Sequence, residues 1–219
     1  GPFTITATAG AGGSTTPSGP TSVACGGSQG FAISAADKCH VIADVKVDNV
    51  SVGAVTSYTF TDVQTNHTIA ASFSLLGPFT ITASAGPGGS ITPSGATVVA
   101  CGASQSFAIS AADKCHIIAD VKVDGVSVGA VANYTFTDVQ ANHTIDATFT
   151  LLGPYTVPAS AGPCGSITLN GPTVVPCGAS QSYAISAGDK CHVIADVKVD
   201  GVSVGAVTAY TFNTVTANH

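Results

Sequence analysis

The residues best suited to chemistry in this chain are its cysteines, six of which follow a fixed pattern. They form three pairs of equal spacing, Cys25 with Cys39, Cys101 with Cys115 and Cys177 with Cys191. A histidine directly follows the second cysteine of each pair: His40, His116 and His192. Cysteines in such a setting can form a disulfide, bind a metal, attach a haem or act as a catalytic thiol.

Three of these four chemistries fit the spacing poorly. A structural zinc site usually contains close pairs such as C-x-x-C, whereas Cys25 and Cys39 are far apart in the sequence. The C-x-x-C-H motif of a covalently bound haem is absent. Alternation along the expected strand places Cys39 on the inward face with Val41 and His40 on the outward face, so the two cannot easily bind one metal. A catalytic thiol needs a base positioned by a third group, and three copies of an inward-facing cysteine do not favour that role.

We therefore predict three disulfides within the repeats, Cys25–Cys39, Cys101–Cys115 and Cys177–Cys191. In the chain-entropy view, closing a loop of this size contributes about 3 kcal/mol. The alternative is a set of buried free thiols in a reducing compartment. The regular cysteine count favours an oxidising one, and so an extracellular or cell-surface location. The sequence indicates no catalytic residue, metal ligand or cofactor site.

Cys164 lies outside this pattern. It occupies the position held by Gly12 and Gly88 in the other copies, within an expected turn, and it makes the total of seven cysteines odd. An odd exposed cysteine in an exported protein indicates either a bond to another chain or a free thiol. We expect Cys164 to form such an intermolecular bond.

Apart from Cys164, these features recur at one constant offset, so the chain consists of tandem repeats. The expected units are residues 1–76, 77–152 and 153–219, and no insertion or deletion separates the copies. Near-identical copies indicate that each unit performs the same task. This favours a row of modules over a single catalytic centre, and we predict that the chain is not an enzyme.

The composition excludes further functions. The 219 residues contain no Arg, and 12 Asp against 6 Lys give a formal net charge of -6. Binding to nucleic acid requires clustered Lys or Arg to neutralise phosphates, so no nucleic-acid partner is expected. No stretch reaches the roughly 18 apolar residues of a membrane span.

Within each unit the apolar residues alternate with polar ones, which predicts half-buried strands. Clear examples are FTITATAG from Phe3 and SYTFTDV from Ser57. HVIADVKVDGVSVG, from His192, is typical of a hairpin with a two-residue turn at Asp200-Gly201. We expect an all-β chain of three small β-sandwich or β-grasp-like modules, each no longer than residues 1–76, arranged as beads in an elongated rod.

The order of these segments resembles that of the divergent InlB B-repeat, a module found in tandem in exported bacterial proteins. The most specific matches are ADVKVDGVSVGAV and NHTI, and the resemblance extends over essentially the whole chain. It implies a small, mostly β module of a secreted or surface protein. An aromatic residue commonly stands in that family where this chain has Cys39, Cys115 and Cys191, so the cysteines depart from its pattern.

Two features of the third unit stand out. It ends at His219, before any counterpart of the segment Thr144–Leu152, which we expect to form the last strand of the second unit. A unit without this strand exposes an apolar groove, so we expect either a longer array or strand exchange with another copy near His219. Pro158 replaces Thr82 in the first strand of the unit, which predicts a strand at a sheet edge or an N–H without a partner there.

These observations favour a structural role. We expect a repeat protein of an extracellular filament, pilus-like fibre or cell-surface stalk, with copies of itself as head-to-tail partners. The alternative is a cell-surface adhesin or a glycan-binding module. Such a module usually presents exposed aromatic side chains on loops, whereas the aromatics here fall in strand positions.

Overall fold

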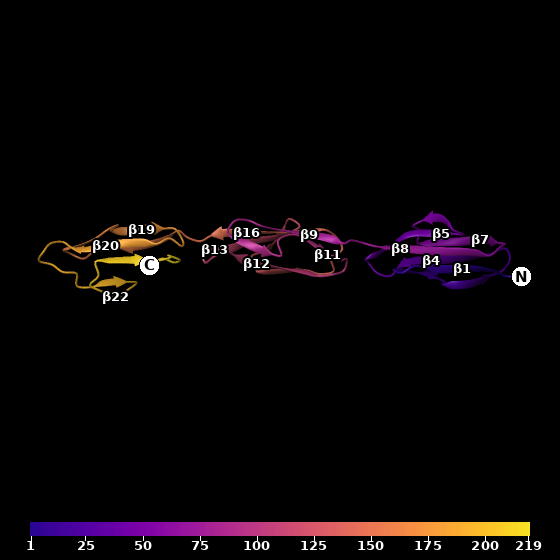
Figure 1. Cartoon of the computed structure of the whole chain (residues 1–219), viewed down its shortest axis with the longest axis horizontal. Coiled ribbons are helices and arrows are strands. Elements are labelled where there is room, and N and C mark those ends of the chain that lie inside the picture. The colour runs from indigo at the N-terminus through magenta and orange to yellow at the C-terminus, as the bar shows by residue number, and fades with distance from the viewer. The chain divides into compact units, whose positions relative to one another are not determined.

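The computed structural model describes every residue from Gly1 to His219, and its regular elements are all strands (Figure 1). The prediction of an all-β chain of three similar units is confirmed. The chain divides into two compact units, residues 1–82 with 95–106 and 135–143, and residues 83–94 with 107–134 and 144–219. Repeat 1 therefore lies wholly in the first unit and repeat 3 wholly in the second.

Repeat 1 consists of a five-stranded and a three-stranded sheet. Its strands are β1 (Phe3–Ala9), β2 (Gly13–Thr16), β3 (Gly19–Val23), β4 (Gly27–Ala35), β5 (His40–Val47), β6 (Val50–Gly53), β7 (Ser57–Val63) and β8 (His67–Leu75). The larger sheet has the order β3-β1-β8-β5-β6 and the smaller one β2-β4-β7. The last strand, β8, is thus central: it runs parallel to β1 and antiparallel to β5.

The alternating apolar residues of both sheets meet in one core. Ile5, Val45 and Ile69 from the larger sheet are fully buried, and Phe31 and Phe60 from the smaller sheet pack in the same cluster. The rings of Phe31 and Phe60 meet edge to face with centroids 6.0 Å apart. Each strand contributes one face to this core, as the period of two predicts.

A β-bulge in β5 changes which side chains face inward. The pairing of β5 with β8 shifts register between Ile42 and Asp44, so one extra residue is accommodated there. Val45 is buried as expected. Before the bulge, however, the alternation is shifted by one residue, and Val41, which was expected to face the core, is 39% exposed. The sequence-based assignment of Cys39 and Val41 to the inward face was therefore wrong.

The repeated Asn-His dipeptide before β8 joins this strand to its neighbours. The Asn66 side chain accepts a hydrogen bond from the Thr4 N–H at 2.8 Å, and His67 Nδ1 lies 2.7 Å from Asp48 Oδ2. Asp48 lies in the tight turn between β5 and β6, with φ of 48°. Partial burial raises the pKa of Asp48, but the hydrogen bonds from His67 and Thr68 lower it by more. The pKa of Asp48 therefore lies below its ordinary value.

Repeat 2 has the same architecture. Its strands are β9 (Phe79–Ala85), β10 (Gly89–Thr92), β11 (Gly95–Val99), β12 (Gln105–Ala111), β13 (His116–Val123), β14 (Val126–Gly129), β15 (Asn133–Phe136) and β16 (His143–Leu151). The sheet orders are β11-β9-β16-β13-β14 and β10-β12-β15. The bulge recurs between Ile118 and Asp120, and Val121 and Ile145 are fully buried.

Repeat 3 lacks a counterpart of β8, and its larger sheet is divided. Its strands are β17 (Tyr155–Ala159), β18 (Gly165–Ile167), β19 (Gly171–Val175), β20 (Gln181–Ala187), β21 (Val197–Val199), β22 (Val202–Gly205) and β23 (Ala209–Phe212). Strands β17 and β19 pair with each other, as do β21 and β22, but the two pairs are not joined. Strand β17, which holds Pro158, is an edge strand, whereas its counterpart β1 in repeat 1 is central.

Thr15 offers a test of how the repeats pack. It is 4% exposed, and its hydroxyl has no hydrogen-bond partner. Ile91 occupies the corresponding position of repeat 2 and is 3% exposed. Because a buried, unpaired hydroxyl is costly and the neighbouring repeat accommodates isoleucine, we expect Thr15→Ile to stabilise repeat 1 by about 1–2 kcal/mol. Denaturant unfolding measures the change; Ile91→Thr is the matched control and should destabilise repeat 2, and an equal loss from both variants would contradict the expectation.

Candidate functional site

The disulfides join consecutive repeats, which corrects the pairing expected from the sequence. Cys39 bonds to Cys101 and Cys115 bonds to Cys177, each over a sequence separation of 62. Cys25, Cys164 and Cys191 are free and exposed. The second cysteine of one repeat therefore bonds to the first cysteine of the next, and none of the three predicted bonds within a repeat is present. Each bond lies within one compact unit.

The bulge in β5 explains why the expected pairing fails. The sequence argument extended strict alternation back to Cys39, which placed its side chain in the core of repeat 1. Cys39 instead precedes β5, in a turn, and the exchange of faces at the bulge removes any reason for it to point inward. Its carbonyl accepts a hydrogen bond at 2.7 Å from Leu76, the residue after β8 in the connection to repeat 2.

A hydrogen-bonded turn presents the second cysteine of each repeat. Asp37 Oδ1 accepts a hydrogen bond from the Cys39 N–H at 2.8 Å and lies 2.8 Å from His40 Nδ1. Asp113 makes the same contacts to Cys115 and His116. The aspartate thus fixes the backbone that carries the sulfur, and the histidine holds the aspartate.

A glycine turn receives the sulfur from the preceding repeat. Gly102 follows Cys101 with φ of 76°, and its N–H donates to the Val139 carbonyl at 2.8 Å. The positive φ favours glycine here, and a Cβ atom at Gly102 would be in van der Waals contact with the Cys39 sulfur, at 3.4 Å. The sequence signal for this role is the Cys-Gly dipeptide, which recurs at Gly26 and Gly178.

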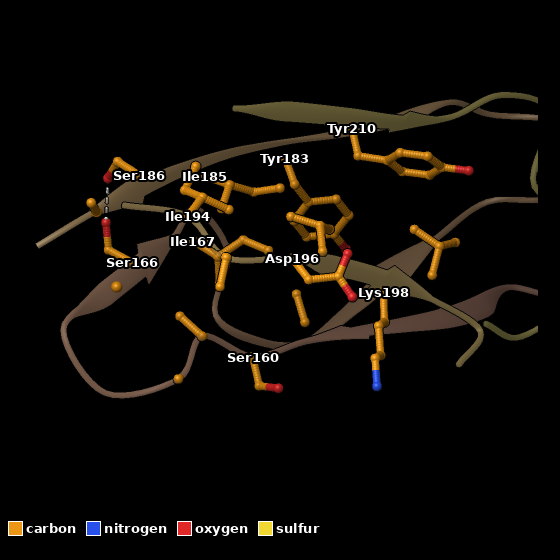
Figure 2. Close-up of a pocket in the computed structure, with 18 of the residues that line it drawn as sticks. Ser160, Ser166, Ile167, Tyr183, Ile185, Ser186, Ile194, Asp196, Lys198 and Tyr210 are labelled. Carbon is orange, nitrogen blue, oxygen red and sulfur yellow. Dashed lines mark hydrogen bonds between the residues drawn. The ribbon is translucent and has the colours of Figure 1, made fainter. Parts of the chain in front are cut away.

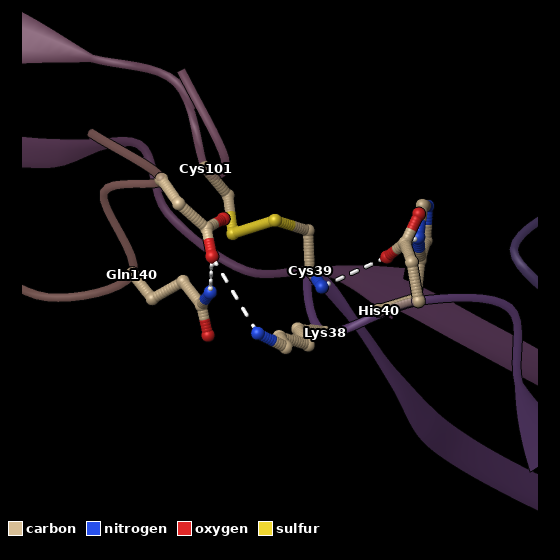
Figure 3. Close-up of a disulfide and its surroundings, with 7 residues drawn as sticks. Lys38, Cys39, His40, Cys101 and Gln140 are labelled. Carbon is tan, nitrogen blue, oxygen red and sulfur yellow. Dashed lines mark hydrogen bonds and ion pairs between the residues drawn. A yellow bond between two sulfur atoms is a disulfide. The ribbon is translucent and has the colours of Figure 1, made fainter. Parts of the chain in front are cut away.

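An ion pair accompanies the first disulfide. Lys38 Nζ lies 3.5 Å from Asp138 Oδ2, and the Gln140 amide donates to the same oxygen at 2.7 Å (Figure 3). Both charged side chains are largely exposed, so the pair orients the junction more than it stabilises it. At the second junction Thr214 stands where repeat 2 has Asp138, so Lys114 meets no carboxylate at that position. Sequence reasoning did not find this pair.

The turn at Asp37 makes the junction sensitive to acid. Hydrogen bonds from the His40 side chain and the Cys39 N–H lower the pKa of Asp37 below its ordinary value of 3.8. A group whose pKa is lowered by folding contributes its stabilisation above the unfolded value and loses it as the pH falls through the folded value. We therefore expect the Cys39 amide resonance to titrate with a midpoint below 3.8 in an NMR pH series. Asp37→Asn is the control and should abolish this titration, whereas a midpoint above the ordinary value would contradict the assignment.

Repeat 3 contains a groove of about 540 Å³. Val157, Tyr183 and Ile194 line it together with Asp196 and Lys198 (Figure 2). The groove separates β17 from β21, and the corresponding strands of repeat 1 are β1 and β5, between which β8 lies. It is therefore the position of a missing strand, which was expected from the sequence.

Cys164 adjoins this groove and differs from its counterparts in its surroundings. A Cβ atom at Gly12 would lie 2.4 Å from the His40 ring, and one at Gly88 would lie 2.5 Å from the His116 ring. Cys164 carries a side chain at this position, with φ of 62°. The His192 side chain is correspondingly 47% exposed, against 26% for His40. The structure holds one chain, so the intermolecular bond expected for Cys164 stays a prediction.

No group of three or more His, Cys, Asp or Glu side chains is placed to hold a metal ion. The structure contains no helix that could span a membrane.

Comparison with known proteins does not assign a family. No family model and no curated protein matches the sequence. Among solved structures, the central fibronectin-III array of RIM-binding protein is similar over 85% of this chain and 80% of its own, with 16% sequence identity and a TM-score of 0.17. This score is too low to establish a shared fold. The chain is thus described by its own structure, as a tandem β-repeat protein with disulfides between repeats.

Proposed function

We propose that the chain is a structural protein of an extracellular filament or cell-surface stalk, in which copies assemble head to tail. The observation that carries this proposal is the placement of the two disulfides, each of which joins one repeat to the next. A bond inside a repeat would stabilise only that repeat. A bond between repeats shortens the covalent path from one repeat to the next, so tension on the chain bypasses the segment between the two bonded cysteines.

The location in this proposal follows from the same bonds. Disulfides persist in oxidising environments such as the cell exterior and are rare in the cytosol. The cystine bridges are therefore consistent with a place outside the cytoplasm. A covalently linked array suits a part that carries tension between a cell and its surroundings.

The surface offers little support for the adhesin or glycan-binding alternative. The large apolar side chains that are well exposed are valines, leucines and an isoleucine, and no aromatic ring is among them. Tyr183, which lines the groove of repeat 3, is 3% exposed and donates its hydroxyl to the Val157 carbonyl. The proposal therefore assigns the chain neither a ligand nor a catalytic role.

Electron microscopy of the producing cells tests the proposal. An antibody raised against the purified chain, detected with gold particles, should label fibres or stalks outside the cell. Cells in which the gene is deleted serve as the control and should lose both the label and the fibres. Label confined to the cell interior, or fibres that persist unchanged in the deletion strain, would overturn the structural role.

A further inference from the structure

The free cysteines Cys191 and Cys25 are the unmatched halves of the junction that the structure contains twice. Cys191 is the second cysteine of repeat 3 and is free in this structure. Cys25 is the first cysteine of repeat 1 and likewise has no partner. Each is exposed, so each is open to another molecule.

The presenting turn of repeat 3 has the same hydrogen bonds as the turns that form disulfides. Asp189 Oδ1 accepts from the Cys191 N–H at 2.8 Å and lies 2.7 Å from His192 Nδ1. These contacts match those of Asp37 with Cys39 and His40. The turn at Cys191 is therefore formed before any bond is made.

The receiving turn of repeat 1 is also formed in advance. Gly26 has φ of 79°, and its N–H donates to the Val63 carbonyl at 2.9 Å, as Gly102 does to Val139. A Cβ atom at Gly26 would meet only Asp62 Oδ1, at 3.7 Å. The space that the Cys39 sulfur occupies beside Gly102 is thus open beside Gly26.

The charges at the two turns are complementary as well. Lys190 precedes Cys191 as Lys38 precedes Cys39, and Asp62 in repeat 1 corresponds to Asp138 in repeat 2. Asp62 accepts a hydrogen bond from Gln64 at 2.9 Å, as Asp138 does from Gln140. The acid that is replaced by Thr214 in repeat 3 is therefore present in repeat 1, where it would face Lys190.

We propose that Cys191 of one copy forms a disulfide with Cys25 of a second copy, and that Lys190 of the first pairs with Asp62 of the second. The contact joins different surfaces of the two copies, so it does not close and can propagate along a linear polymer. The inference rests on the proposed function, because it names the bond that holds the head-to-tail assembly together. It assigns an intermolecular role to Cys191 and Cys25, besides the one expected for Cys164.

The bond requires an oxidant, for which a small-molecule disulfide such as oxidised glutathione suffices. The Cys191 thiolate attacks this disulfide, forms a mixed disulfide and releases one glutathione thiolate. The Cys25 thiolate then attacks the Cys191 sulfur and releases the second. The two protein thiols lose two electrons and two protons, and one oxidised glutathione becomes two reduced ones.

Mixing two variants, each of which keeps only one of the two cysteines, tests the pairing directly. In a background of Cys164→Ser, the Cys25→Ser variant keeps Cys191 and the Cys191→Ser variant keeps Cys25. With oxidised glutathione, each variant alone should stay monomeric on a nonreducing gel, and the mixture should give a dimer and nothing larger. The parent with both cysteines should give a ladder of oligomers that reductant collapses to monomer.

Mass spectrometry of tryptic peptides identifies the bonded cysteines. The wild-type chain does not suffice for this, because trypsin releases the same sequence, CHVIADVK, from Cys39 and from Cys191. Val193 is 87% exposed, so Val193→Ala alters the mass of the Cys191 peptide at little structural cost. Mixing isotope-labelled and unlabelled chains then shows whether the bond joins two molecules. A labelled–unlabelled pair of the Cys25 and Cys191 peptides is the expected product.

Three results would overturn the inference: no dimer in the mixture, a dimer from either variant alone, or a Cys25–Cys191 bond only within single chains. None of these results alters the outcome of the gold-labelling experiment. Labelled fibres without the Cys25–Cys191 bond would leave the structural function standing and remove this junction. The Cys25–Cys191 bond without labelled fibres would support this junction and remove the structural function.

Discussion

Reduction of the two disulfides is expected to lengthen the mechanically extended chain by about 400 Å. When the chain is pulled from its ends, tension passes through covalent bonds by the shortest route. It reaches Cys39, crosses to Cys101, and later crosses from Cys115 to Cys177. The residues between the two cysteines of each bond carry no tension while the bond is intact.

The size of the effect follows from the sequence separation of 62 in each bond. An extended chain spans about 3.3–3.6 Å per residue, so each bypassed segment would contribute about 200 Å. The bonded cysteines instead hold their Cα atoms 5.6 and 5.7 Å apart. Strands β5 to β8 of repeat 1 and β9 to β11 of repeat 2 lie in the first protected segment.

Single-molecule force spectroscopy with handles at the two ends measures this length with and without reductant. The Cys39→Ser/Cys101→Ser variant should lengthen by half of the full amount, and so should the Cys115→Ser/Cys177→Ser variant. A bond between Cys25 and Cys39 would bypass a much shorter segment, worth about 45 Å of extended chain. Three such bonds would give a total gain of about 135 Å, and a gain of that order would favour the pairing within repeats and contradict the structure.

The elements of this fold could be predicted from the sequence because its apolar period is so regular. Alternation identified β1, β7 and the turn at Asp200-Gly201, and the constant offset between copies gave the three similar units. The alternation of apolar and polar residues within a strand does not show which other strand it pairs with. The parallel pairing of β1 with β8 joins the two ends of a repeat, and a period of two is the same for parallel and antiparallel neighbours.

The disulfide pairing could not be predicted because it depends on the single extra residue of the bulge in β5. Nothing in the alternation of HVIADVKV marks the bulge between Ile42 and Asp44, yet that extra residue exchanges the faces upstream of it. The partner of Cys39 then depends on how one repeat meets the next, which no pattern within a repeat contains. The presenting and receiving turns correspond to recurring Asp-Lys-Cys-His and Cys-Gly sequences, but nothing in those sequences shows that the two turns meet.

Restoring the missing strand to repeat 3 is expected to stabilise that repeat by about 3 kcal/mol or more. The change is to append a copy of Thr144–Leu152 after His219 and to replace Cys164 with glycine. In repeat 2 this segment buries Ile145 completely and leaves Ala147 only 2% exposed. Burying an isoleucine or phenylalanine side chain contributes about 1.5–3 kcal/mol each.

The start of the strand is already in position. His219 donates its N–H to the Thr156 carbonyl at 3.2 Å, and its Nδ1 lies 2.9 Å from Asp200 Oδ2, as His67 does from Asp48 in repeat 1. Beyond it, the groove of about 540 Å³ holds the place of the strand. Val197, partly exposed in this structure, corresponds to Val45 and Val121, which are 0% exposed, so its burial is part of the expected gain.

Cys164 decides how much of the gain is realised. If His192 took the place of His116 against the turn, the Cys164 side chain would overlap its ring, as a Cβ atom at Gly88 would lie 2.5 Å from His116. The extension alone should therefore stabilise repeat 3 less than the extension with Cys164→Gly, and Cys164→Gly alone should have little effect. This non-additivity identifies the contact, because independent sites would add.

Hydrogen exchange of residues 192–199 measures the result locally, and denaturant unfolding measures it for repeat 3 as a whole. These residues are mostly outside strands here, whereas the corresponding residues of repeat 2 form β13, so they should become protected in the extended chain. The matched control is the same extension with aspartate in place of its isoleucine, since a charge cannot be buried there without a large cost. Equal protection in both extended chains would show that the added residues do not enter the groove, and the account of repeat 3 as a fold that lacks its central strand would then fail.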